Sequence, residues 1–248
     1  MACVIHPPLF ERNFMTNKIF IITLIIMLFM VSATGFASER YQWKLAATED
    51  GCQIYTSNVA GKDYIAAKAT CVFPARLEVI GTILRDIPNY PEWMDDCDTT
   101  KILKTVDDEK DVFIFWLRQH VTMFPDRDMV LKSKTIIDMK NGRSLVYADS
   151  TNEIPFDAGK GYVRMPSFHS LFTMEWIDRE NTRVTFMVDP DLGKGIPSSI
   201  ANRLIKTNPY KTLKKMMKMA KKNQYIEAAA TSKYRKYVEE ALKKNYVK

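Results

Sequence analysis

Few side chains in this sequence could carry acid–base or metal chemistry, and they are scattered along the chain. His120 and His169 lie far apart, and neither has a second metal ligand at the spacing of a zinc site. Asp95 and Asp96 are adjacent, so their carboxylates diverge in an extended segment and do not by themselves form a catalytic pair. The sequence contains no G-x-S-x-G, no H-E-x-x-H and no phosphate-binding glycine loop. It therefore predicts no catalytic residue, no metal site and no cofactor.

Alternating strands dominate the middle of the chain and would position any site. Residues 128–138 are the clearest case, because one face of the predicted strand is uncharged while the other carries the charges. The uncharged positions are Met129, Leu131, Ser133, Thr135 and Ile137. Residues 168–176 and 183–188 alternate in the same way, which predicts an antiparallel sheet with one solvated face. Residues 112–121 are apolar on both faces, a pattern that this sheet does not explain.

The preceding segment predicts a helix, a hairpin and a second helix. We expect a short opening helix over residues 38–46, hairpin arms at residues 52–57 and 64–73, and a helix over residues 77–85. Residues 86–97 contain two prolines and are expected to be irregular.

The hairpin brings two cysteines together. A two-residue turn at Gly61 and Lys62 gives a register with Cys52 opposite Cys71, within disulfide range. An oxidising compartment would allow that bridge, whereas two small buried hydrophobic side chains are the alternative interpretation. Cys97 would then remain a thiol.

The carboxy-terminal part is helical and basic. Apolar residues recur at helical spacing from Ile196 to Ala220, with a kink or brief interruption expected at Pro209, and residues 225–248 predict one more helix. Residues 211–248 hold 12 Lys and Arg against 3 Glu, and since the whole chain carries +7, the remainder carries −2. This basic end predicts either transient contact with an anionic membrane surface or an ordinary solvated face, and the acidic remainder disfavours nucleic acid.

The first residues resemble an export signal. A basic start at Met15, an apolar run over residues 19–31 and small residues at Gly35 and Ala37 predict a signal peptide cleaved after Ala37. The protein is thus expected in the periplasm, with retention of the uncleaved apolar run as a membrane anchor the alternative.

The order of several short motifs resembles the START domain family of steroid- and lipid-binding proteins, especially its exported bacterial members. These motifs are DGCQIYT, NYPEWMDDC, FPDRDMVL, GYVRMP, DPDLGKGIPSSIANRL and PYKTL, and they cover about residues 40–220. The resemblance implies an α+β helix-grip fold, in which a curved antiparallel sheet wraps around a long carboxy-terminal helix and encloses an apolar cavity. We divide the chain into a signal peptide (1–37), whose true start we expect at Met15, a START-like domain (38–222) and a basic helical extension (223–248).

Site residues follow from that resemblance. The tunnel would be lined by the strand residues, covered by helix residues and gated by a Trp-Met pair. The expected ligand-binding residues are Trp93, Met94, Trp116, Arg127, Met129, Leu131, Ser133, Ile137, Tyr147, Ile200, Leu204 and Leu213. Arg127 could bind a polar lipid head, although an ion pair with Asp126 or Asp95 is the favoured interpretation because arginine is rarely buried unpaired. Relatives that bind cholesterol keep a second arginine where this chain has Ser133, which argues against sterol specificity.

The resulting hypothesis is a protein that binds, and could transfer, a lipid or other apolar molecule in a pocket of about 300 to 1,000 Å³ without catalysis. One alternative is an enzyme of the polyketide cyclase type, for which Arg127, Tyr147 and Asp149 are the best acid–base positions. The other is an interaction module that holds a membrane or protein partner through its basic end.

Overall fold

The computed structural model describes residues 40–248, which form one compact unit. The predicted signal peptide, the cleavage site after Ala37 and the apolar run at residues 19–31 lie outside this range. Between residues 40 and 248, no helix has both the length and the apolar character needed to cross a bilayer.

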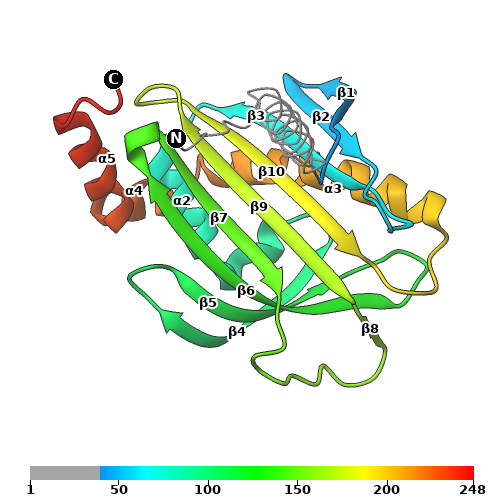
Figure 1. The fold of residues 1–248 in the computed structure, drawn as a ribbon. Helices are drawn as coiled ribbons and strands as arrows, with labels where there is room; N and C mark the ends of the chain where they lie inside the picture. The colour runs from blue at the N-terminus through cyan, green and yellow to red at the C-terminus, as the bar shows by residue number, and fades with distance from the viewer. Residues whose placement is uncertain (1–39) are drawn as a thin grey trace, which may run out of the picture. The chain divides into compact units, whose positions relative to one another are not determined.

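A long, curved antiparallel sheet forms the body of the molecule, as predicted (Figure 1). Nine strands follow the spatial order β1-β2-β3-β10-β9-β7-β6-β5-β4, so β1 and β4 are the two open edges, and β8 pairs in parallel with β6. The strands are β1 (Lys44–Glu49), β2 (Cys52–Ser57), β3 (Ala66–Phe73), β4 (Cys97–Asp107), β5 (Val112–Gln119), β6 (Asp126–Asp138), β7 (Arg143–Ser150), β8 (Tyr162–Arg164), β9 (Ser167–Trp176) and β10 (Thr182–Asp191).

The helices lie on one side of this sheet or at its end. They are α2 (Leu77–Arg85), α3 (Ser198–Met219), α4 (Asn223–Thr231) and α5 (Lys233–Lys243), with short 3-10 turns η2 (Ile87–Glu92) and η3 (Met139–Asn141). Helix α3 packs against β2, β3 and β10, whereas α4 and α5 pack against α2 (Figure 1). Helix α3 continues through Pro209 without interruption.

Two helix predictions were wrong. The described part of the predicted opening helix, residues 40–46, is irregular up to Trp43 and then enters the edge strand β1, because the backbone pairs with β2 from Lys44 to Glu49. The final segment is two helices, because the chain is extended at Ser232, whose hydroxyl accepts a hydrogen bond from the Arg235 amide and starts α5. The proline-rich segment also contains one short regular element, the 3-10 turn η2.

The predicted hairpin register is confirmed. Ile54 pairs with Ala69 and Thr56 with Ala67, although the ladder ends at Ser57 and Ala66, which leaves an eight-residue loop in place of the predicted two-residue turn. Cys52 and Cys71 form a disulfide with their Cα atoms 4.4 Å apart. Cys97 is a buried free thiol.

The outer side of β5, which the sequence left unexplained, is covered by the loop between β7 and β8. The Trp116 ring packs 5.2 Å from Phe156 of that loop, and its indole N–H donates to the buried carboxylate of Asp128. Arg164 of β8 donates to the same carboxylate from Nη2, across 2.7 Å. On the outer face of β5, Ile114 is buried and Trp116 half-buried, which explains why apolar side chains occur on both faces.

Candidate functional site

Two adjoining pockets lie beneath α3, against the concave face of the sheet. The inner pocket is built from the inward-facing side chains of β5, β6, β7, β9 and β10, closed by residues of η2 and the segment after it. Its lining is mostly apolar and comprises Tyr90, Met94, Phe115, Leu117, Gln119, Met129, Leu131, Ser133, Val146, Ala148, Phe168, Ser170, Phe172, Phe186 and Asn208. Strand alternation places these side chains on one face because successive Cβ atoms point to opposite sides.

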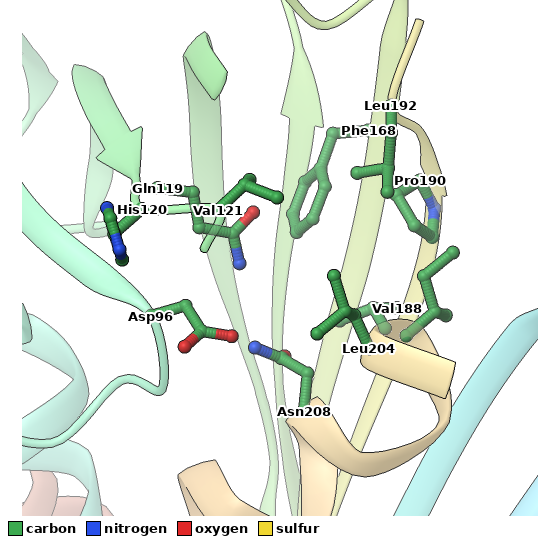
Figure 2. Close-up of a pocket in the computed structure, with 11 residues that line it drawn as sticks. Asp96, Gln119, His120, Val121, Phe168, Val188, Pro190, Leu192, Leu204 and Asn208 are labelled. Atoms are coloured by element: carbon green, nitrogen blue, oxygen red, sulfur yellow. The ribbon is translucent and has the colours of Figure 1, made fainter. Parts of the chain in front are cut away.

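The outer pocket opens between the end of β5, the end of β10 and the first half of α3 (Figure 2). It is lined by Asp96, Gln119, His120, Val121, Phe168, Val188, Pro190, Leu192, Leu204, Ile205 and Asn208. Gln119, Phe168 and Asn208 line both pockets, so the two spaces meet at these three side chains.

The pockets are narrower than the sequence predicted. The space between protein atoms, including that open to solvent, is about 440 Å³ in the outer pocket and about 540 Å³ in the inner one. The enclosed cavity volume is about 40 Å³ in the outer pocket and about 30 Å³ in the inner one, well below the predicted range of about 300 to 1,000 Å³. A guest with a hydrocarbon chain would therefore need the lining side chains to move apart.

Packed aromatic rings form one wall of the inner pocket. The rings of Phe172 and Phe186 stack with their centroids 4.0 Å apart and an interplanar angle of 9°. Trp93, which is fully buried, packs edge-on against Phe172 and Tyr90 from behind. The Tyr90 hydroxyl donates to the carbonyl of Leu84 across 2.6 Å, so this phenol is already satisfied inside the protein.

Arg127 is occupied by the protein backbone. Its Nε donates to the carbonyl of Leu192 and its Nη2 to that of Lys194, each across 2.9 Å, and its Nη1 donates to the carbonyl of Pro125. The side chain is fully buried, and burial lowers the pKa of the guanidinium. The favoured ion pair with Asp126 or Asp95 is thus not formed. Backbone dipoles take its place and hold the segment after β10 against β6.

The structure brings together five of the twelve predicted site residues. Met94, Met129, Leu131 and Ser133 line the inner pocket, and Leu204 lines the outer one. The remaining seven lie elsewhere. Trp93 and Leu213 are fully buried in the core, and Ile137 is partly buried beside it. Ile200 is 40% exposed, Trp116 and Tyr147 face the outer side of the sheet, and Arg127 donates to backbone carbonyls. Which of the twelve contact a ligand stays a prediction.

Three important lining residues were not predicted. Asn208 lies one helical turn after Leu204, so the helical spacing that identified Leu204 could have identified it as well. Gln119 is the last residue of β5, and Phe168 is the second of β9. Phe168 shares the face of Ser170 and Phe172 in the predicted alternating strand, so alternation could have identified it. Gln119 carried no such signal, because its approach to α3 depends on how distant elements are placed.

The histidines are engaged in single contacts. His120 Nδ1 lies 3.0 Å from Asp126 Oδ1, and the His169 ring hydrogen-bonds to Asp149 on the outer face. In the part of the chain that the structure describes, no three His, Cys, Asp or Glu side chains cluster as metal ligands would.

Comparison with known proteins agrees with this architecture. An uncharacterized protein of Pseudomonas aeruginosa is 29% identical over 199 residues, which cover 78% of this chain and 93% of that protein. The STAR-related lipid transfer protein of Xanthomonas axonopodis has the same fold, with a TM-score of 0.65 and 24% identity over 73% of this chain and 99% of that one. Human StAR-related lipid transfer protein 5 superimposes with a TM-score of 0.63 and 14% identity over 84% of this chain and 97% of that one. The family model described as the START domain matches residues 27–225, and the chain therefore belongs to the START domain family.

Proposed function

We propose that this protein binds a lipid or another apolar molecule in the two joined pockets beneath α3 and releases it unchanged, which would suit transfer. The observation that carries the proposal is the mostly apolar lining of the two pockets, supplied by five strands and one helix. Burial of apolar surface contributes about 25 cal/mol per Å², so a hydrocarbon chain would be held mainly by burial. The two structural neighbours named as lipid transfer proteins support the same function.

Binding without catalysis is favoured by the placement of the acid–base candidates. The three side chains best suited to an enzyme of the cyclase type were Arg127, Tyr147 and Asp149. Arg127 is committed to backbone carbonyls, while Tyr147 and Asp149 alternate with the inward-facing Val146 and Ala148 and so point to the outer face of β7. None of the three lines the two pockets beneath α3.

The test is whether the protein carries a lipid when purified from cells. Native mass spectrometry should detect an added mass, and extraction should yield an apolar compound. Ser170→Leu fills the inner pocket and should reduce occupancy at least tenfold, whereas Thr173→Leu, on the outer face of the same strand, should leave it unchanged. A correctly folded protein that remains empty when offered membrane lipid extracts would refute the proposal.

A second proposal concerns the basic end, which we infer makes transient contact with an anionic membrane surface. Lys218, Lys221 and Lys222 are exposed and form no ion pair within residues 40–248. Near an anionic bilayer each contributes about 1 kcal/mol.

Vesicle sedimentation tests this contact. Replacing Lys218, Lys221 and Lys222 by Gln should weaken binding to phosphatidylglycerol vesicles at least tenfold, with little binding to phosphatidylcholine in either form. The control replaces the exposed Lys101 and Lys104 of β4 by Gln. Equal loss in both variants would indicate a general charge effect, and binding that survives in both would remove the proposed role.

Export is proposed from the first residues of the sequence. We infer that residues 1–37 are a signal peptide and that the mature protein begins at Ser38 in the periplasm. The disulfide between Cys52 and Cys71 supports this, since such bridges persist in oxidising compartments. Sequencing the amino terminus of the protein from a periplasmic fraction would test this, and a terminus at Ser38 is expected. An uncleaved chain in the membrane fraction would favour the anchor.

A further inference from the structure

Polar side chains converge where the two pockets meet. The carboxylate of Asp96 and the carboxamides of Gln119 and Asn208 point toward the same space, beside the ring of Phe168 (Figure 2). Apart from this cluster, the ring of His120, the hydroxyl of Tyr90 and the small hydroxyls of Ser133 and Ser170, the cavity walls are apolar. The junction is therefore the natural position for the polar end of a bound lipid.

The orientation of Asn208 makes its free atom an acceptor. Its Nδ2 donates to the backbone carbonyl of Asp95 across 3.1 Å, and since a carbonyl can only accept, the amide nitrogen must be on that side. Its Oδ1 has no hydrogen-bond partner among residues 40–248. Asp96 adds a carboxylate, which also accepts only, while Gln119 can donate or accept. The cluster thus offers mostly acceptors.

No lysine or arginine balances this cluster from the cavity wall. Of the side chains that line the two pockets, only Asp96 carries a full charge, and His120 is turned to the side, where its ring hydrogen-bonds to Asp126. Arg127 uses all three of its donor nitrogens on backbone carbonyls. An anionic ligand would therefore contact a carboxylate but no lysine or arginine of the cavity wall, because Lys211 and Lys215, which lower the pKa of Asp96, are not among the lining residues.

On the basis of the proposed function, we propose that the ligand is an uncharged lipid whose polar end is a hydrogen-bond donor, such as a hydroxyl, and that the cavity discriminates against lipids with an anionic end. A hydroxyl at the junction would donate to Asp96 or to Asn208 Oδ1 and could accept from Gln119. A carboxylate or phosphate there would leave those acceptors unpaired and would lie beside a like charge, which is costly in a partly desolvated site.

The state of Asp96 agrees with this assignment. Burial, together with the neighbouring Asp95, raises the pKa of its carboxyl above the ordinary value. The carboxylate of Asp96 is thus already poorly hydrated in the free protein. It could accept a hydrogen bond from the ligand without first losing strong hydrogen bonds to water.

Oleyl alcohol and oleic acid test the proposal because they share one chain and differ only at the polar end. The purified protein, stripped of endogenous lipid, is offered both in competition at pH 8, and the bound fraction is extracted and quantified. We expect at least tenfold preference for the alcohol. Asp96→Asn should raise oleate binding several-fold with little change for the alcohol, and Gln119→Leu should lower alcohol binding. Ser170→Leu should reduce both, as a control for blocked access.

The possible outcomes distinguish failure of this inference from failure of the proposed lipid-binding function. Equal binding of the two probes, unaffected by Asp96→Asn, would overturn the inference and leave lipid binding intact. The co-purified lipid gives a second readout, since a carboxylate or phosphate monoester at its polar end would also overturn it. Failure to bind either probe, with no co-purified lipid, would remove the proposed function itself.

Discussion

The side-chain amide of Asn208 donates to the backbone carbonyl of Asp95 across 3.1 Å and ties α3 to the segment that follows η2. Two further contacts join the same partners along one face of the helix: the Asp95 amide donates to Thr212 Oγ1 across 3.1 Å, and Lys215 Nζ donates to Asp95 Oδ1 across 2.8 Å. Helix α3 covers the cavity, and Met94, next to Asp95, lines it. These contacts therefore hold α3 against the segment that forms the facing wall of the cavity.

Thr212→Val should loosen this attachment while preserving its shape. Thr212 is fully buried, and its loss as an acceptor leaves the Asp95 amide unpaired, at a cost of about 1 to 3 kcal/mol. Urea unfolding measures this loss, and hydrogen exchange should be faster at Asp95. Thr207→Val is the matched control, since the Thr207 hydroxyl donates only within its own helix. Similar losses in both variants would contradict the role of the Asp95 contact.

Arg127→Met should destabilise the fold more than a single lost ion pair would. The substitution keeps most of the buried volume but leaves the carbonyls of Leu192, Lys194 and Pro125 without their donor, which should cost about 3 kcal/mol. The stability of Arg127→Lys should lie between those of the wild-type protein and Arg127→Met, because one ammonium group cannot donate to all three carbonyls as the planar guanidinium does. Urea unfolding would measure both. The control is Arg203→Met on the exposed side of α3, and a loss no larger than that control would refute this account.

Arg127 also shows where sequence reasoning succeeds and where it stops. The alternation that placed Met129 and Leu131 on the inner face of β6 is a local property, and so is the hairpin register that paired Cys52 with Cys71. Both could be predicted because each depends on the residues of one strand or one turn. The partners of Arg127 are backbone carbonyls, which every residue carries, so no residue type identified them.

The cavity and the edge of the sheet illustrate the same limit. Asn208 and Gln119 meet only because a helix and a strand end are close in space, which periodicity does not report. Residues 44–49 form β1 because an unpaired edge of β2 is available to them, a tertiary effect that local helix signals cannot include. The width of the pocket depends on side-chain packing and could not be predicted either.

Gly81→Ala should reveal how tightly α5 packs on α2. An added Cβ at Gly81 would lie 2.9 Å from Cδ2 of the Tyr234 ring, which cannot easily swing away because its hydroxyl donates to Asp111 across 2.6 Å. We expect a net loss of about 1 to 2 kcal/mol, since overpacking outweighs the gain in helix propensity.

A double-mutant cycle isolates this contact. In a Tyr234→Ala background the clash is absent, so Gly81→Ala should be neutral or stabilising, and the coupling measured by urea unfolding should exceed about 1 kcal/mol. Additive effects would show that the ring of Tyr234 yields freely, and hence that α5 is loosely attached to α2.

Two aspartates should respond to pH in opposite ways. Burial, then Asp95, raises the pKa of Asp96, while Lys211, Lys215 and His120 act in the other direction without cancelling the rise. A raised pKa means that the folded state disfavours the carboxylate, so Asp96 weakens the fold as pH rises through its folded pKa. Asp96→Asn should therefore increase stability at pH 7, and the gain should vanish below about pH 4, where the unfolded state also binds the proton.

Asp189 supplies the opposite sign. Burial alone would raise the pKa of its carboxyl, but hydrogen bonds from Lys62 and Tyr41, with the charges of Lys62 and Arg40, hold it below the ordinary value. Its ionised form stabilises the fold above the unfolded pKa, and that contribution is lost as pH falls through the folded pKa. Asp189→Asn should thus destabilise at pH 7 and progressively less in acid. Urea unfolding of both variants between pH 3 and pH 7 checks the pair, and pH profiles of the same sign would show that one of these environments is misassigned.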